Sequence, residues 1–116
     1  MGWRRWGDPV LVVDIVRLRE TRGVLAEILD ERDRQEHLKA AGRFVGTCAD
    51  HELTNAEKLA VLVEEVGEVA RALLSQPDRQ LARDQLSNRE CLRTELVHVA
   101  TVAVAWIESL NGEAPT

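Results

Sequence analysis

Aromatic side chains are scarce in this sequence, whose 116 residues include three Trp, one Phe and no Tyr. Proteins that bind single-stranded nucleic acid stack its bases on aromatic rings, and this chain has few rings to offer. Basic charge is also in short supply, because 15 Lys and Arg face 20 Asp and Glu, which leaves a net charge of −5. A nucleic acid backbone is bound by clustered basic side chains. Both shortages argue against DNA or RNA as a partner.

Cysteine is nearly absent as well. Cys48 and Cys91 are too few for a disulfide framework and do not form a zinc-binding pattern. Reduced thiols are normal in the cytoplasm, so we expect a cytoplasmic protein. The longest apolar run, Val99–Ile107, is too short to cross a bilayer, and no apolar segment of a signal peptide follows the N-terminal arginines. We therefore expect no contact with a membrane.

Helix-breaking residues are few, since the chain has only three Pro and seven Gly. Apolar residues recur at helical spacing in 10–41, 55–74 and 89–110. Gly23 is expected to divide the first stretch into two pieces, and residues 78–86 are expected to form a short polar helix. The sequence therefore predicts an all-α bundle of about four to five helices in one domain.

The chain divides into three parts. Residues 1–23 are expected to form a partly helical N-terminal extension, residues 24–110 the helical domain and residues 111–116 a tail. The last helix of the domain is apolar on almost every side, which predicts a central helix buried by several neighbours in an oligomer. The loop around residues 42–53 contains Asp50, for which turn contacts are expected.

The run Lys58–Leu74 is the most informative stretch. Its carboxylates Glu64, Glu65 and Glu68 cluster within about 100° of one another around a helix. Such carboxylates repel one another unless positive charge lies between them, and a divalent cation with oxygen ligands would supply it. The alternative is a solvated acidic face on an ordinary amphipathic helix. Thr54 and Glu57 match a capping box at the start of this helix.

Glu95 and His98 lie about 60° apart on the last helix, among apolar neighbours. A buried carboxylate needs compensation, so Glu95 either pairs with an arginine or faces the other carboxylates across a cation. His98 is either a hydrogen-bonded core residue or a metal ligand.

Together, Glu64-Glu65-x-x-Glu68 and Glu95-x-x-His98 resemble the metal-binding signature of the MazG-like all-α nucleoside-triphosphate pyrophosphohydrolases. In that family EExxE is followed, after a variable gap, by ExxD. The segment at residues 31–35 resembles the helix with Arg and Gln that precedes the first motif in some members. The resemblance covers about residues 27–110.

This resemblance implies a helical fold that forms a homodimer or a dimer of dimers, with Mg²⁺ held against a nucleoside triphosphate. The reaction would be hydrolysis between the α and β phosphates, which gives a monophosphate and pyrophosphate and would remove surplus nucleotides. Glu64, Glu65, Glu68 and Glu95 match metal-binding positions of the family, and His98 stands where the family has Asp. Imidazole suits Mn²⁺ better than Mg²⁺, so the site either keeps Mg²⁺, prefers Mn²⁺ or retains only binding.

Candidate roles follow for the remaining residues. Glu65 or Glu68 would orient or deprotonate the attacking water. Lys58 and Arg71 flank the first motif and either neutralise outer phosphates or lie in solvent. Contacts to the nucleotide by Arg34 and Gln35 are implied only by the resemblance. Two other functions stay open, a nucleotide- or metal-binding regulator without turnover and a purely structural helical dimer.

Overall fold

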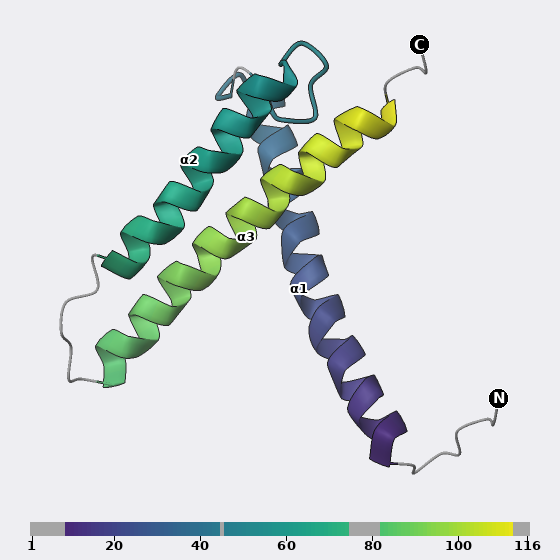
Figure 1. Ribbon diagram of the computed structural model, residues 1–116, viewed down its shortest axis with the longest axis vertical. Coiled ribbons are helices and arrows are strands. Elements are labelled where there is room, and N and C mark those ends of the chain that lie inside the picture. The colour runs from purple at the N-terminus through teal and green to yellow at the C-terminus, as the bar shows by residue number, and fades with distance from the viewer. Residues whose placement is uncertain (1–8, 45, 75–81, 113–116) are drawn as a thin grey trace.

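The computed structural model describes residues 9–44, 46–74 and 82–112, and within them the secondary structure is entirely helical. Figure 1 shows the three helices, α1 (Pro9–Ala40), α2 (Asn55–Leu74) and α3 (Ala82–Gly112). The all-α prediction is confirmed for these residues, while the expected count of four to five helices is not.

Two expected interruptions are missing from these helices. Gly23 lies inside α1, because one glycine costs only about 1 kcal/mol and helix propagation past it is cooperative. The predicted polar helix at 78–86 is not separate either. Residues 78–81 lie outside the described part of the chain, and residues 82–86 form the first turns of α3. The helix α1 also continues across the predicted boundary at residue 23. The division of the chain into residues 1–23 and 24–110 stays a prediction.

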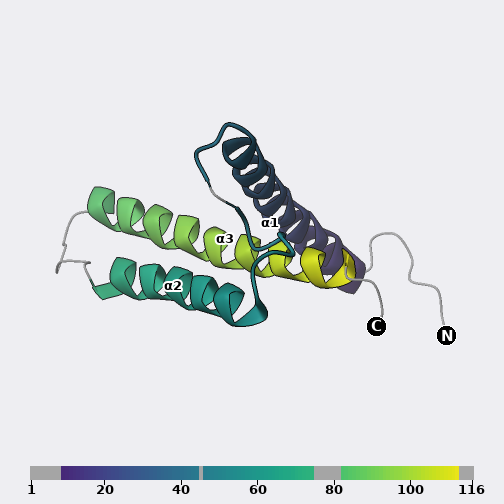
Figure 2. The same cartoon turned by 90° about the horizontal axis from the view of Figure 1, so that it is seen from above.

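The third helix, α3, lies between the other two in space and contacts both of them. Figures 1 and 2 show α2 running alongside α3, while α1 crosses α3 at a steep angle. This position agrees with the nearly all-round apolar pattern of α3. Two hydroxyls on its most buried face, those of Thr101 and Ser109, are satisfied by donating to the backbone carbonyls of Val97 and Trp106, at 2.7 and 2.6 Å.

The buried core between these helices is small. Among the described residues, the buried hydrophobic side chains are those of Cys48, Val102 and Ala105. In contrast, many large apolar side chains on all three helices are at least two fifths exposed. They include Val13, Val24, Leu25 and Leu29 on α1, Val63, Val66 and Leu73 on α2, and Leu96, Ile107 and Leu110 on α3.

The overall dimensions are also those of an open arrangement. The radius of gyration is 18.7 Å, whereas a compact domain of this length has about 13 Å. Within the described residues, no helix is both long enough and apolar enough to cross a membrane.

The connection between α1 and α2 is held in place at both ends. Gly42 ends α1 with a φ of 76°, where the missing Cβ removes the steric penalty. At the other end, Thr54 and Glu57 form the predicted capping box, in which the Thr54 hydroxyl accepts from the Glu57 N–H at 3.1 Å and Glu57 accepts from the Thr54 N–H at 3.2 Å.

Between these ends, Asp50 fixes the loop. Its carboxylate accepts hydrogen bonds from the Thr47 N–H, at 2.7 Å, and from the Lys39 ammonium. The predicted turn role of Asp50 is thereby confirmed. A Cβ at Gly46 would lie only 2.5 Å from Oδ2 of Asp50, so a larger residue there would displace this carboxylate. The loop in turn forms one wall of the site described next.

Candidate functional site

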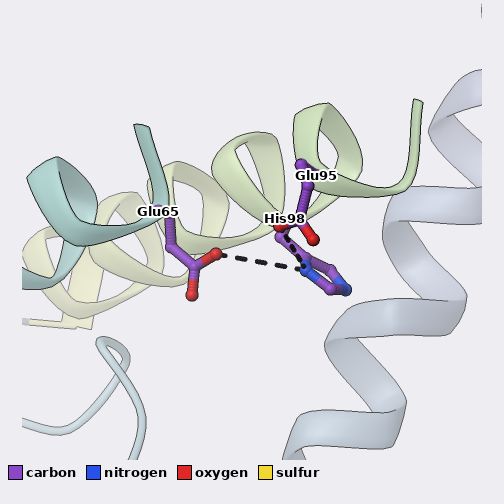
Figure 3. A group of neighbouring side chains, drawn as sticks. All are labelled: Glu65, Glu95 and His98. Atoms are coloured by element: carbon purple, nitrogen blue, oxygen red, sulfur yellow. Dashed lines mark ion pairs between the residues drawn. The ribbon is translucent and has the colours of Figure 1, made fainter. Parts of the chain in front are cut away.

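Glu65, Glu95 and His98 converge between α2 and α3, as Figure 3 shows. One possible ligand atom from each residue lies within 4.8 Å of the others. Nδ1 of His98 lies 3.4 Å from Oε2 of Glu95 and 4.0 Å from Oε2 of Glu65. Glu95 and His98 are one turn apart on α3, and Glu65 reaches them from α2. We call these three residues the Glu65–Glu95–His98 cluster.

The cluster carries negative charge in a partly desolvated place. Burial raises the pKa of Glu65, His98 acts against this rise, and the carboxylates of Glu95, Glu64 and Glu68 add to it. A carboxyl in this position would be stabilised in its ionised form by a nearby cation. Two carboxylates with one imidazole form a donor set that suits Mn²⁺ and later divalent metals, and the carboxylates alone also suit Mg²⁺. The residues present therefore fit a divalent cation.

The other predicted metal ligands lie beside the cluster. Glu64 is exposed, and Glu68, one turn after Glu65, lies 3.4 Å from the guanidinium of Arg71. Three of the five predicted ligands are thus brought together, and Glu64 and Glu68 are their neighbours on α2. The Arg71 side chain is 76% exposed, so its proposed phosphate contact is sterically open.

Glu31 of α1 joins the site from the side opposite Glu95. Its Oε1 lies 3.5 Å from Nε2 of His98. Arg34 donates to both carboxylate oxygens of Glu31, from Nε at 2.8 Å and from Nη2 at 2.6 Å. The hydrogen bond from Arg34 lowers the pKa of Glu31 despite its partial burial, and Gln35 also contributes a hydrogen bond.

Sequence patterns alone do not single out Glu31. Its place in a strongly polar helix gave no reason to prefer it over the neighbouring charges. A usable signal was the spacing, since positions 31, 34 and 35 are related by three and four residues and share one face of a helix.

A cavity of about 270 Å³ adjoins the cluster. Glu65 and His98 line one side of it, and Arg34 and Gln35 line the side formed by α1. The predicted nucleotide-contacting pair thus lies across a cavity from the predicted metal ligands. Much of the remaining wall is apolar and is formed by Phe44, Cys48, Val61, Val102 and Ala105.

Lys58 does not line this cavity. It is 1% exposed, and its ammonium donates to Oγ of Ser109 at 2.7 Å, which ties α2 to the end of α3. Lys58 also precedes Glu65 by two helical turns, or about 10 Å along the axis. The structure therefore brings Arg34 and Gln35 to the site but does not bring Lys58 there.

Two further basic residues of α1 have structural partners. Arg32 is 7% exposed, and it pairs with Glu108 of α3 at 2.7 Å and with Glu36 at 2.6 Å. Lys39 pairs with Asp50 of the loop. Arg34 lines the cavity, whereas Arg32 and Lys39 do not.

Comparison of the chain with protein-family models, with curated proteins and with solved structures finds no match. Membership of the MazG-like family stays a prediction.

Proposed function

We propose that this protein is a metal-dependent nucleoside-triphosphate pyrophosphohydrolase. It would cleave ribo- or deoxynucleoside triphosphates between the α and β phosphates and release a monophosphate and pyrophosphate, as a cytoplasmic enzyme that removes surplus nucleotides. The observation that carries the proposal is that Glu65 and His98, two members of the possible cation site Glu65–Glu95–His98, line a cavity that Arg34 and Gln35 also line.

The cavity suits the nucleoside part of such a substrate. Small-molecule sites combine mostly apolar walls with a few well-placed polar groups. Here Phe44, Val61 and Val102 supply apolar surface, and the Gln35 amide supplies both a donor and an acceptor. The nucleoside would lie between α1 and the loop, with its phosphates directed toward the cluster.

The cluster would hold the cation that the triphosphate requires. Glu65, Glu95 and His98 are the proposed ligands, with Glu64 and Glu68 next to them on α2. A bound Mg²⁺ or Mn²⁺ would offset the phosphate charge and activate water. Because an imidazole is present, we expect Mn²⁺ to serve at least as well as Mg²⁺.

A carboxylate outside the cluster is available for proton transfer. Glu68 lies one turn from Glu65 and is not among the three converging side chains. It would orient the attacking water and accept its proton. Glu65 is the second candidate for this role, because it lines the cavity beside His98. Arg71, exposed beside Glu68, would meet the outer phosphates.

We also propose that the protein acts as a homodimer or a dimer of dimers. Exposed apolar side chains such as Leu25 and Leu29 on α1 and Val63 and Val66 on α2 support this, because contiguous exposed apolar surface marks an interaction site. The small core and the large radius of gyration support it as well. Helices from a second copy would complete the bundle.

The test is release of monophosphate and pyrophosphate from a panel of ribo- and deoxynucleoside triphosphates, run in parallel with Mg²⁺ and with Mn²⁺. We expect turnover by the wild type and its loss in Glu95→Gln, which removes a proposed ligand. Glu90→Gln removes an exposed carboxylate from the same helix and should retain turnover. Release of a diphosphate and phosphate, or equal loss in both variants, would contradict the proposal.

A nucleotide-binding regulator without turnover is the second candidate, and His98 is the observation that favours it. An imidazole in place of a carboxylate removes one negative charge and one oxygen ligand. Calorimetric binding of a triphosphate by a folded protein that releases no product with either metal would establish this function. Failure to bind any triphosphate would exclude it.

A further inference from the structure

The imidazole of His98 lies between two sets of carboxylates that approach different nitrogens. Nδ1 faces Glu95 at 3.4 Å and Glu65 at 4.0 Å, while Nε2 faces Glu31 at 3.5 Å. The two nitrogens of one ring direct their lone pairs away from each other, so only one of them can bind a given cation. Glu65 and Glu95 are therefore placed to share a cation with Nδ1 of His98, whereas Glu31 lies on the opposite side of the ring, next to Nε2.

The carboxylate of Glu31, which faces Nε2 of His98, is fixed in place by Arg34. Arg34 contacts both of its oxygens, and the Glu31 side chain is only 13% exposed. Bidentate pairs of this kind are strong and geometrically specific. The 3.5 Å separation from Nε2 exceeds a hydrogen bond by a few tenths of an ångström, which a small rotation of either side chain would remove.

An ionised carboxylate only accepts hydrogen bonds. A carboxylate facing Nε2 therefore favours the form of His98 in which Nε2 carries the hydrogen. In a neutral imidazole, the lone pair then lies on Nδ1, the nitrogen that faces Glu65 and Glu95. Metal-binding histidines generally donate their second N–H to a carboxylate or carbonyl, which fixes the ring and strengthens the ligand.

We propose that Glu31 is a positioning residue that, fixed by Arg34, holds His98 with Nε2 protonated and Nδ1 directed at the cation. Through this contact α1 would raise the affinity of the Glu65–Glu95–His98 cluster for cations that accept an imidazole nitrogen, so that Mn²⁺ is favoured over Mg²⁺. The inference rests on the metal centre of the proposed function, but it does not depend on hydrolysis.

The first test compares cation affinities of metal-free wild type, Glu31→Gln and Glu27→Gln. Glu27 is the matched control, because it lies one turn before Glu31 on α1 and its carboxylate makes an equivalent two-oxygen contact with Arg93 of α3, at 2.6 and 2.7 Å. Binding of Mn²⁺ is measured from the electron paramagnetic resonance signal of the free ion, and Mg²⁺ is measured by calorimetry.

Glu31→Gln should weaken Mn²⁺ binding about 10- to 100-fold, as loss of an outer carboxylate does elsewhere. Its Mg²⁺ affinity should change less, since magnesium prefers oxygen ligands. Glu27→Gln should leave both affinities unchanged. An equal fall in Mn²⁺ affinity in both variants would mean that only the packing of α1 on α3 matters, and it would overturn the inference. So would failure of the wild type to bind Mn²⁺.

The second test determines which nitrogen of His98 binds the metal and which carries the hydrogen. In protein labelled with ¹⁵N-histidine and loaded with Zn²⁺, a diamagnetic probe, His98 should show a metal-bound Nδ1 and a protonated Nε2. A metal-bound Nε2 would overturn the inference. If Mn²⁺ binding depends on Glu31 but no triphosphate is hydrolysed, the proposed function fails while the role of Glu31 stands.

Discussion

Single side chains decide where charge is concentrated in this molecule. The rise in the pKa of Glu65 comes first from burial and then from three neighbouring carboxylates, with His98 acting against it. Glu31 is different, because Arg34 lowers its pKa and compensates its charge. Uncompensated negative charge therefore lies on the α2 and α3 side of His98, which is where a cation is expected.

Glu68 provides a test of catalysis at this scale. We expect Glu68→Ala to lower kcat by about 10²- to 10⁴-fold, the range associated with loss of a general base. The helical circular dichroism should be unchanged, because Glu68 is partly exposed and, within the described residues, its ion-pair partner is the neighbouring Arg71. Unfolding of the variant, or full activity, would count against its role.

Asp50 gives a prediction for stability against pH. Burial alone would raise its pKa, but the hydrogen bonds from Lys39 and from the Thr47 N–H outweigh burial and hold that pKa below its ordinary value. A lowered carboxyl pKa adds stability above its ordinary range, and this contribution is lost as the pH falls through the folded-state pKa. Asp50→Asn should therefore cost about 1 kcal/mol near pH 7, or about 4 °C in Tm.

The same comparison in acid is the control for Asp50. The difference in Tm between wild type and Asp50→Asn should begin to shrink below about pH 4, where Asp50 of the unfolded chain takes up a proton, and should be lost as the pH falls through the lower pKa of the folded state. A difference that is constant from pH 7 to pH 3 would show that the charge of Asp50 contributes nothing. Because the loop forms a wall of the cavity, the variant should also raise KM more than it lowers kcat.

At the scale of elements, local signals predicted where helices begin better than where they are interrupted. The capping box at Thr54 was predicted from two residue types at one spacing, and it is present. Gly23 was predicted to interrupt α1, yet α1 continues through it. Capping is set by residues three apart, whereas the effect of a glycine depends on the helix on both sides of it.

The cap of α2 is open to a direct test. Thr54→Ala should destabilise the protein by about 1 kcal/mol, because it removes the acceptor for the Glu57 N–H. Thr54→Ser keeps a hydroxyl and should stay close to wild type. Urea unfolding followed by circular dichroism measures both. Equal stability of all three proteins would mean that α2 does not depend on this cap.

At the scale of the whole molecule, the single chain leaves much apolar surface open. Leu25 and Leu29 are 56% and 60% exposed, and the core that the structure describes has three buried hydrophobic residues. Small domains need most of their apolar surface covered to be stable. A second copy is the partner that we propose, since homodimers with twofold symmetry are the commonest assemblies.

The mass in solution tests this assembly. Sedimentation should give twice, or four times, the chain mass of 13.0 kDa. Leu25→Asp should lower that mass, because a charge at an apolar interface is costly to desolvate. Glu20→Gln, at an exposed polar position on the same helix, should leave the mass unchanged. A wild type that sediments as a monomer at micromolar concentration would contradict the proposal.

The sequence by itself determined the all-helical structure of the described residues and the cap at Thr54, because helical period and capping are local physics. The convergence of three of the five predicted ligands was suggested by a two-helix motif, but it is the packing of α2 against α3 that brings it about. The tertiary structure alone decided that Glu31 meets His98, that Arg32 pairs with Glu108 and that Lys58 is buried against Ser109. These contacts join residues more than 50 positions apart. Helical spacing specifies which residues share a face, but it does not specify which other helix that face will meet.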